Sequence, residues 1–318
     1  MISVAMTTYN GEKYLSQQLD SIRNQTVKVD EIIVCDDNSS DETVNILHQY
    51  PVTVIQNSVN LGFKANFKKA LEHCHGDYIF LCDQDDMWMH DKVEKMMSIM
   101  ENTSGIHALA SSFDYVDSNG KKIETKLKPR WSNNNLYPRE VADGELVEVP
   151  LQELLYANFF QGACMLIDKE TAQEFINCFE DTVPHDWLMN VYASLTNGMY
   201  FYNIPLVQYR IHSENTLGIP QLDTDLGNHV QRSSTLKIRL QYAEGPLHIL
   251  QALQKNKSEF YITHEKDFDS LAIFLKKHIQ VMENKQLFPL LLQNFNPWYK
   301  KIESWRARLM DILYVISH

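Results

Sequence analysis

The chain has 318 residues, of which 44% are hydrophobic and 22% are charged, a composition typical of a globular protein. Its formal net charge of -12 excludes the broad basic surface of a nucleic-acid-binding protein, so we expect no nucleic-acid partner. The five cysteines are odd in number and form no CxxC pair. This pattern excludes a zinc-binding spacing and favours free, buried thiols in a reducing compartment.

The N-terminal segment, residues 1–6, lacks the basic start and the long apolar run of a signal peptide. No stretch of the chain approaches the roughly 20 apolar residues that are needed to span a bilayer. We therefore expect a cytoplasmic protein that is soluble or at most bound to a membrane surface.

The first hundred residues alternate short apolar runs with amphipathic patterns. We expect strands at 2–6, 31–35, 52–56 and 78–82, and helices at 11–25, 41–50, 63–74 and 90–100. Strands that are each followed by a helix predict an α/β fold with a mostly parallel sheet covered on both faces. Such sheets bind ligands beyond the carboxyl ends of their strands.

The pattern changes after about residue 106. The alternating pattern breaks from about 106 to 150, where residues 126–135 form a polar, turn-prone, loop-like segment. Helix and strand patterns resume from 151 to 212. The rest of the chain is helical in pattern, with helices expected at 233–254, 265–284 and 298–316.

Polar clusters follow three of the expected strands, at residues 7–10, 36–41 and 83–86. In the second cluster, Ser40 or Asp41 is expected to cap the helix that follows. That interpretation leaves Asp36 and Asp37 without a partner directly after a buried strand. A nucleoside base or ribose would supply the missing hydrogen-bond donors.

The run Asp83-Gln84-Asp85-Asp86 is the sharpest signal in the sequence. Three carboxylates within four residues repel one another unless a cation neutralises them. Oxygen ligands favour a hard ion such as Mg²⁺ or Mn²⁺, which would stabilise the diphosphate that leaves a nucleotide sugar. The alternative is an acidic surface turn, but the buried strand directly before the carboxylates favours the ion. Because the chain has no P-loop and no GxGxxG after its first strand, phosphates would be held mainly by metal and side chains.

Seven segments, in this order, together resemble an inverting family 2 glycosyltransferase of the GT-A fold. They are residues 6–10, 36–41, Asn60-Leu61-Gly62 with Asn66, 81–86, 161–162, 185–187 and 209–212. Their pattern is most similar to bacterial rhamnosyltransferases of cell-wall and capsular polysaccharide synthesis. The resemblance implies a GT-A domain over residues 1–215, with a mostly parallel central sheet flanked by helices, and a helical C-terminal extension over 216–318.

The resemblance also implies roles for single residues. The nucleoside would be held by Thr7, Tyr9, Asp36 and Asp37, with Asp37 facing the base and Asn66 beside the donor. Asp83 and Asp85 match the family's DxD signature; Asp85 would bind Mn²⁺ or Mg²⁺ directly, and Asp83 would contact both the ion and the donor. His212 would complete the metal or diphosphate site, although a lone histidine in a polar segment is also typical of a solvated side chain. Asp86 would cap the helix that follows.

Asp186 would be the general base, which takes the proton of the acceptor hydroxyl as its oxygen attacks the anomeric carbon. A single displacement of this kind inverts the configuration of the sugar. The alternative is a structural role, in which Asp186 caps the helix after it. One carboxylate can be both a helix cap and a general base. Leu188 stands where relatives often carry a second tryptophan, which leaves the shape of the acceptor pocket open.

We therefore expect a metal-dependent glycosyltransferase, with dTDP-L-rhamnose as the first choice of donor. The acceptor would be a hydroxyl of a growing polysaccharide or lipid-linked oligosaccharide, contacted by the loop at 126–135. A UDP-hexose or UDP-N-acetylhexosamine transferase and a non-catalytic nucleotide-sugar-binding module are the alternatives. A nucleotidyltransferase is disfavoured because residues 6–11 lack its glycine-rich basic loop. Donor sugar, linkage and oligomeric state stay open, since no short motif encodes them.

The C-terminal segment, residues 296–316, mixes aromatic residues with cations in an amphipathic helical pattern. Such a helix suits peripheral contact with the inner face of the cell membrane. The alternative is a terminal helix that packs its apolar face on the rest of the protein.

Overall fold

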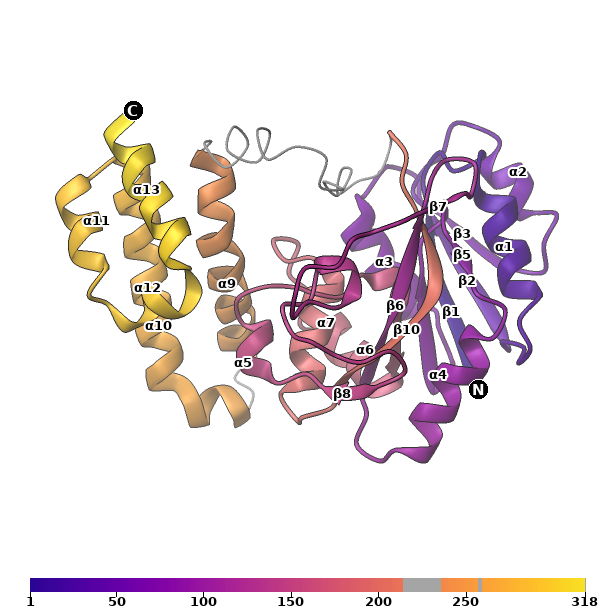
Figure 1. Cartoon of the computed structure of the whole chain (residues 1–318). Coiled ribbons are helices and arrows are strands. Elements are labelled where there is room, and N and C mark those ends of the chain that lie inside the picture. The colour runs from indigo at the N-terminus through magenta and orange to yellow at the C-terminus, as the bar shows by residue number, and fades with distance from the viewer. Residues whose placement is uncertain (214–235, 257–258, 318) are drawn as a thin grey trace. The chain divides into compact units, whose positions relative to one another are not determined.

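The computed structural model describes residues 1–213, 236–256 and 259–317. These residues fall into two compact units (Figure 1). The first contains residues 1–154 and 158–213, and the second contains residues 155–157 and the described residues from 236 onward. The domain boundary expected between 215 and 216 lies outside the described residues.

The first unit alternates strands and helices. Its strands are β1 (Ile2–Thr8), β2 (Glu31–Asp36), β3 (Thr53–Gln56), β4 (Tyr78–Cys82), β5 (Met87–Trp88), β6 (Ala108–Val116), β7 (Lys122–Ile123), β8 (Leu146–Glu148), β9 (Met165–Asp168) and β10 (Met199–Arg210). Its helices are α1 (Leu15–Arg23), α2 (Thr43–Leu47), α3 (Phe63–Glu72), α4 (Lys92–Asn102), α5 (Leu151–Leu154), α6 (Lys169–Asn177) and α7 (His185–Ser194), with short 3₁₀ turns η1 (Asn133–Asn135) and η2 (Gly162–Cys164).

The strands of the described chain form one mixed, mostly parallel sheet in the order β3-β2-β1-β4-β9-β6-β10-β5. β1 is parallel to β2 and β4, and β6 is parallel to β10. β9 is antiparallel to both β4 and β6, so β4 and β6 run in the same direction. As a result, β1, β2, β4, β6 and β10 all end at the same edge of the sheet.

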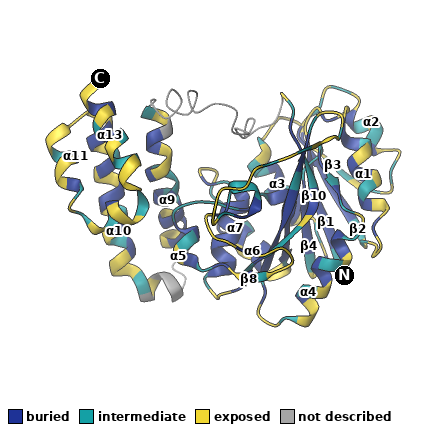
Figure 2. Cartoon of the chain, viewed as in Figure 1, coloured by how far each residue is buried: buried dark blue, intermediate teal, exposed yellow. Residues whose placement is uncertain are grey.

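Helices cover both faces of the sheet, as the alternating pattern predicts. α3, α6 and α7 contact one another and lie on one face, whereas α1, α2 and α4 lie on the other (Figure 1). The central strands are therefore buried on both sides (Figure 2). Val4, Ala5 and Met6 in β1 have no exposed surface, which explains why this strand is a continuous apolar run and not an alternating one.

The four strands and four helices expected in the first hundred residues are confirmed, with α1 and α2 shorter than expected. Where the alternating pattern breaks, from about 106 to 150, the structure contains a strand that the sequence pattern did not reveal: β6 has nine residues and lies between β9 and β10. It is buried on both faces and contains Ser111 and Ser112, so its sequence shows neither alternation nor a β-branched run. Residues 126–135 are irregular, as expected, apart from η1.

The second unit is helical. It consists of α9 (Leu236–Asn256), α10 (Glu259–Glu283), α11 (Leu287–Gln293), α12 (Pro297–Ile302) and α13 (Trp305–Ser317). The start expected for the first of these helices, at 233, lies outside the described residues. Within the described chain, no helix is both long and apolar enough to cross a bilayer.

The single helix expected from 298 to 316 is wrong, because the chain forms α12 and α13 instead. Glu303 is extended, and the Ser304 hydroxyl accepts the backbone N–H of Ala307 at 3.2 Å. Serine at this position caps a new helix, which the amphipathic pattern alone does not reveal. α11 was not expected either.

Candidate active site

The candidate active site lies at the edge of the sheet where the parallel strands end. Thr7 is the last residue but one of β1, Asp36 ends β2, and Asp83 follows β4. β10 ends at Arg210, which places His212 just beyond the same edge. The shared direction of these strands brings together residues that are up to 205 positions apart, from Thr7 to His212.

The first acidic cluster, Asp36 and Asp37, is saturated with hydrogen bonds from the protein. The Asp36 carboxylate accepts the Thr8 hydroxyl at 2.9 Å, and the Ser39 hydroxyl and backbone N–H at 2.5 and 2.9 Å. Asp36 has no exposed surface. Its carboxylate therefore fixes the turn after β2 and ties it to β1.

Asp37 holds the next loop in the same way. It accepts the Asn57 side-chain amide at 2.8 Å and the backbone N–H groups of Leu61 and Gly62 at 2.7 and 2.8 Å. The expectation that Asp36 and Asp37 lack partners is wrong, because residues 57–62 fold back over the cluster. Gly62 adopts a φ of 83°, which L side chains rarely adopt, so this return turn favours glycine.

The side chain of Asn66 belongs to the hydrogen-bond network around this cluster. Its side chain donates to the Cys35 carbonyl at 2.7 Å and accepts the Asn57 amide at 2.9 Å. Asn66 is 1% exposed. It reaches Asp37 through Asn57, so the structure shows it as a support of the cluster.

Gln84 clamps the loop after β1 to the loop after β4. Its side-chain oxygen accepts the Tyr9 backbone N–H at 2.8 Å, and its side-chain NH₂ donates to the Tyr9 carbonyl at 3.0 Å. A Cβ atom on Gly11 would collide with the same amide. The Tyr9 side chain is exposed and Thr7 is largely buried. The middle residue of the Asp83–Asp85 signature thus aligns two loops, a role that the sequence analysis missed.

The second acidic cluster, Asp83, Asp85 and Asp86, is short of donors. Burial, together with the charges of Asp85 and Asp186, raises the pKa of the Asp83 carboxyl to about 7. Burial and the charges of Asp85 and Asp83 also raise the pKa of Asp86 well above its usual range. One Asp86 oxygen has no hydrogen-bond partner among the described residues. Carboxyls in this state are stabilised by a nearby cation.

The expectation that Asp86 caps the next helix is wrong. α4 begins at Lys92 with Asp91 at its cap position, and β5 intervenes between Asp86 and the helix. Asp86 instead turns inward and accepts the backbone N–H of Arg210 at 2.9 Å. It therefore connects the β4 loop to the end of β10.

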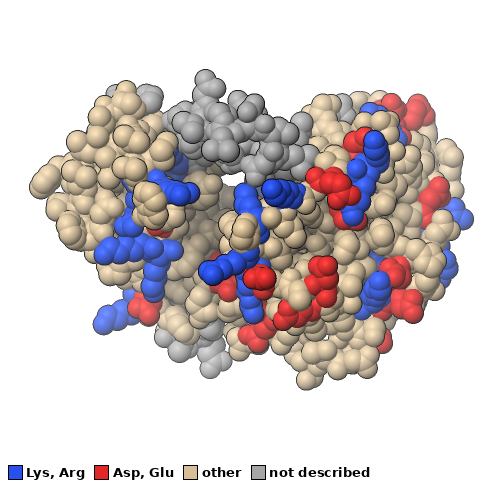
Figure 3. Space-filling model, viewed as in Figure 1, with Lys and Arg blue, Asp and Glu red and all other residues tan. Residues whose placement is uncertain are grey.

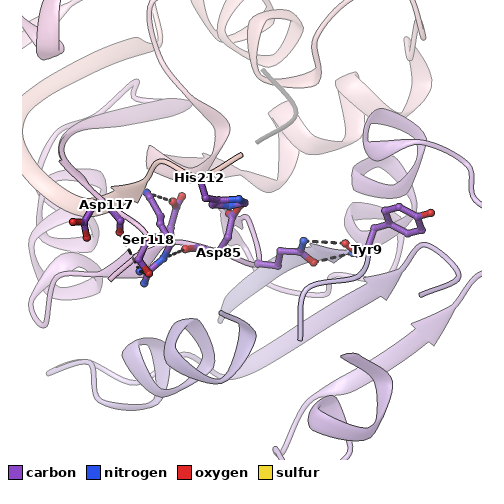
Figure 4. A network of polar contacts seen from close by, with 8 residues as sticks. Tyr9, Asp85, Asp117, Ser118 and His212 are labelled. Carbon is purple, nitrogen blue, oxygen red and sulfur yellow. Dashed lines mark hydrogen bonds and ion pairs between the residues drawn. The ribbon is translucent and has the colours of Figure 1, made fainter. Parts of the chain in front are cut away.

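Arg210 secures the same loop from its side chain. Its guanidinium donates to the Asp85 carbonyl at 2.7 Å and to the carbonyls of Asp117 and Ser118 at 3.4 and 3.2 Å (Figure 4). Arg210 is 1% exposed and lies over the Tyr14 ring, with 4.5 Å between the guanidinium carbon and the ring centroid. The resemblance included Arg210 in a motif but gave it no role.

His212 lies against Asp85. Its Nε2 is 2.8 Å from a carboxylate oxygen of Asp85, and both side chains are partly exposed (Figure 4). Asp85 and His212 thus offer a carboxylate and an imidazole side by side, and Asp83 and Asp86 lie next to Asp85 in the chain. The unpaired Asp86 oxygen and the raised pKa of Asp83 mark this cluster as one that a divalent cation would stabilise, although Asp83, Asp85 and His212 are not among the described groups whose ligand atoms all lie within 4.8 Å of one another.

Asp186 lies in the first turn of α7 and is not its cap residue, which is Pro184. One oxygen of Asp186 accepts the Gly162 backbone N–H at 3.2 Å, and the other accepts the Trp187 N–H at 2.8 Å. A Cβ atom on Gly162 would lie 2.7 Å from the His185 ring, so this close approach favours glycine. The charge of Asp186 acts on Asp83, which places the expected base near the second acidic cluster.

Lys92 is a buried cation that the sequence analysis did not single out. Its ammonium donates to the Ala163 carbonyl at 2.7 Å and lies 4.0 Å from the centroid of the Trp88 ring. Burial lowers its pKa to about 8. A signal was present, because Lys92 is in helical phase with Met96 and Met100 on the apolar side of α4.

A separate group, His107, Asp168 and Glu170, brings three potential ligand atoms within 4.8 Å of one another. Asp168 accepts the Thr171 N–H at 2.8 Å as the cap of α6, and it lies 2.6 Å from Nδ1 of His107. These contacts explain the group as part of the fold.

Comparisons with known proteins agree with this geometry. Residues 3–152 match the family model of Glycosyl transferase family 2. The matched region, 150 of the 318 residues, is similar to a glycosyltransferase domain. The matched region holds both acidic clusters, whereas Asp186 and His212 lie beyond it.

Two curated relatives are named as glycosyltransferases. An uncharacterized glycosyltransferase of Methanocaldococcus jannaschii is 36% identical over 136 residues, which cover 41% of this chain and 47% of the relative, about half its length. The dTDP-rhamnosyl transferase RfbG of Shigella flexneri is 28% identical over 235 residues, or 67% of this chain and 73% of the relative.

Solved structures share the fold. The crystal structure of S. aureus TarS 1–349 in complex with UDP-GlcNAc has a TM-score of 0.55 at 16% identity, covering 99% of this chain and 89% of that one. The mannosyltransferase PcManGT from Pyrobaculum calidifontis, in complex with GDP-Man and Mn²⁺, has a TM-score of 0.50 at 14% identity, covering 99% and 86%. The predicted GT-A fold is confirmed.

Proposed function

We propose that the protein is an inverting, metal-dependent hexosyltransferase that moves a sugar from a nucleotide-diphosphate donor to an acceptor hydroxyl. The observation that carries this proposal is the pairing of Asp85 with His212 at the edge where the parallel strands end, with the charge of Asp186 acting on the neighbouring Asp83. We assign transfer to residues 1–215 and regard 216–318 as a helical extension.

Asp85, Asp83 and His212 would hold a divalent cation, Mn²⁺ or Mg²⁺. The solved mannosyltransferase with a similar fold contains Mn²⁺, which supports this choice of ion class. When bound, the ion would offset the negative charge that develops on the departing diphosphate. Arg210 and Gln84 would keep the loop of Asp85 in place through the contacts that they make with its backbone and with Tyr9.

Asp186 would act as the general base. Its carboxylate takes the proton of the acceptor hydroxyl while that oxygen forms a bond to the anomeric carbon. The bond from this carbon to the donor phosphate breaks on the opposite face, and the diphosphate leaves with the electron pair. The Gly162 and Trp187 N–H groups hold the carboxylate in place.

The nucleoside would lie across the ends of β1 and β2, beside Thr7, Tyr9, Asp36 and Asp37, with Asn66 as a support of the donor site. We take dTDP-L-rhamnose as the first choice of donor, because RfbG is named a dTDP-rhamnosyl transferase. UDP-hexoses and UDP-N-acetylhexosamines are the alternatives, and the TarS structure contains UDP-GlcNAc.

The acceptor would be a growing polysaccharide or a lipid-linked oligosaccharide, with residues 126–135 near its binding site. We place the enzyme in the cytoplasm, in peripheral contact with the inner face of the cell membrane through its C-terminal helix, α13. A role in cell-wall or capsule synthesis follows from this assignment.

The test is turnover of a panel of nucleotide sugars with Mn²⁺, Mg²⁺ or EDTA by the wild type, Asp186→Asn and a control, Asp181→Asn. Asp181 is an exposed acid five positions before Asp186 in the chain. We expect one donor to be turned over with metal, a fall of about 10²–10⁴-fold in Asp186→Asn, and little change in the control. The product should have an inverted anomeric centre by NMR.

Two results would contradict the proposal. Failure to bind any nucleotide sugar under every metal condition would exclude a glycosyltransferase. Metal-dependent binding without turnover across all acceptor classes would favour the non-catalytic sugar-binding module.

A further inference from the structure

α11 and α13 present large apolar side chains to solvent. We call this set the apolar face; it comprises Leu287, Phe288, Leu291, Leu292, Phe295, Trp305, Leu309, Leu313 and Ile316. Phe288 is 71% exposed and Phe295 is 79% exposed, values expected of lysine and not of phenylalanine. Contiguous exposed apolar surface of this kind marks an interaction site.

The two helices of the apolar face contact each other, and each has apolar side chains on its exposed side as well as on its buried side. On α11, Leu290 and Gln293 point into the unit, and Gln293 lies 2.7 Å from Nδ1 of His278 in α10. The opposite side of α11 carries Phe288 and Leu292, and Phe295 is exposed in the turn that follows the helix.

α13 repeats this arrangement. Asp311, Tyr314 and Val315 are buried, whereas Trp305 and Leu309 lie on the opposite side at a spacing of four, followed by Leu313 and Ile316. Each helix thus turns its polar anchors inward and its apolar stripe outward.

The charged side chains that accompany the apolar face are cationic. Lys285, Lys300, Lys301 and Arg306 are exposed between residues 285 and 317. The acids of this segment are turned inward: Asp311 is bound by Arg239 and Tyr299, each at 2.7 Å, and Glu303 is partly buried. Lysines and arginines gather around the tan surface of this helical unit in Figure 3.

Two of these cations lie over tryptophan rings. The Lys301 ammonium is 4.7 Å from the centroid of the Trp298 ring, and the Arg306 guanidinium is 5.4 Å from that of Trp305. Tryptophan and cations together are typical of the boundary between acyl chains and head groups. In a chain with a net charge of -12, this local excess of positive charge is complementary to an anionic surface.

We propose that the apolar face docks on an anionic lipid bilayer, with α11 and α13 lying in the interface and Lys285, Lys300, Lys301 and Arg306 contacting lipid phosphates. This proposal rests on the proposed function, which includes a lipid-linked acceptor and names α13 alone as the contact with the membrane. It adds α11 and the four cations to that contact. The partner is a lipid surface because exposed phenylalanine and tryptophan side chains can enter the acyl chains while the neighbouring cations contact the head groups.

The experiment is co-flotation of the full chain with vesicles of phosphatidylcholine, with and without phosphatidylglycerol. Three variants are compared with the wild type: Phe288→Ser with Phe295→Ser, Lys300→Glu with Lys301→Glu, and Ile273→Ser as a matched control. Ile273 is 68% exposed on α10 and lies outside the apolar face. Donor turnover in solution is measured on the same preparations.

We expect the wild type and Ile273→Ser to float with the phosphatidylglycerol vesicles, and both double variants to lose at least about tenfold in partitioning. The lysine variant should resemble wild type at high salt, because screening removes the electrostatic contribution. Absence of wild-type flotation, or equal flotation of all variants, would overturn the proposal. So would a wild-type dimer by light scattering that only the phenylalanine variant dissociates, since the apolar face would then bind a second copy. Flotation without donor turnover would count against the proposed function alone.

Discussion

The two acidic clusters of the first unit have similar sequences and opposite environments. Both follow buried parallel strands that are separated in the sheet by β1 alone. Asp36 and Asp37 receive six hydrogen bonds of 2.5–2.9 Å from hydroxyl, amide and backbone donors. Asp83 and Asp86 are raised in pKa, and one Asp86 oxygen has no partner among the described residues.

The difference teaches how to separate an architectural carboxylate from a ligand-binding one. A carboxylate that is surrounded by N–H and O–H donors is already stabilised as an anion and holds the loops that supply those donors. Neighbouring carboxylates that receive few donors, as Asp83 and Asp86 do, are left for a cation to stabilise. Substitution of an aspartate in the first cluster should therefore lower the stability of the protein. Substitution in the second cluster should impair metal binding and turnover.

Among the changes that test the contrast between the two clusters, the largest effect is expected for Asp85→Asn. The substitution keeps the shape of the side chain and removes the charge that would bind the cation beside His212. Turnover should fall by about 10²–10³-fold, and the rise in melting temperature on adding Mn²⁺ should disappear. Full turnover with an unchanged Mn²⁺ effect would show that the second cluster is not the metal site.

Lys92→Met should have the next largest effect. Its ammonium holds the Ala163 carbonyl, which follows the Gly162 N–H that binds Asp186. We expect kcat to fall by about 10–100-fold with little change in the donor KM, because the base is displaced while the nucleoside site is intact. Met96→Leu, buried on the same helix, is the control for repacking. Equal losses in both variants would mean that Lys92 only packs.

Asp37→Ala tests the first cluster. The substitution leaves the Leu61 and Gly62 N–H groups and the Asn57 amide without their acceptor. We expect the free energy of unfolding, measured with urea, to fall by about 1–3 kcal/mol. Asp85→Asn should not share this loss, and a similar fall in both variants would erase the contrast between the clusters.

The smallest effect is a pH dependence of the metal-free protein. The pKa of Asp83 is about 7 in the folded state and near its ordinary, lower value in the unfolded chain. Between these values the folded state holds a proton that the unfolded state has lost. Stability should therefore fall as pH rises from about 4 to about 7, by at most about 1.4 kcal/mol per pH unit from this group, and level off above.

The measurement for this prediction is urea unfolding in EDTA across the pH range, with Asp83→Asn as the comparison. The variant lacks the titrating carboxyl, so its slope should be shallower. Saturating Mn²⁺ should flatten the wild-type slope as well, because a metal-bound carboxylate is ionised throughout. A steeper slope in Asp83→Asn would contradict the assignment.

The sequence by itself determined the framework of the first unit. Apolar runs at β1, β2, β3 and β4, each with a helix after it, were sufficient because parallel strands buried on both faces are apolar throughout. The same rule located both acidic clusters at strand ends. The family resemblance, and not spacing, assigned Asp85 and His212 to one metal site; the structure pairs the two side chains, and their role in binding metal stays a prediction.

Only the tertiary structure decided which carboxylates are satisfied and what holds them. Asp37 is saturated by a return of residues 57–62, and Asp86 turns inward to Arg210 from 124 positions away. A lysine is usually expected at the surface. Only the contact of the Lys92 ammonium with the Ala163 carbonyl shows that this one is buried. These outcomes depend on donors supplied by distant segments. A hydrogen bond between distant segments produces no periodic pattern in the sequence around either partner, so local sequence patterns do not predict it.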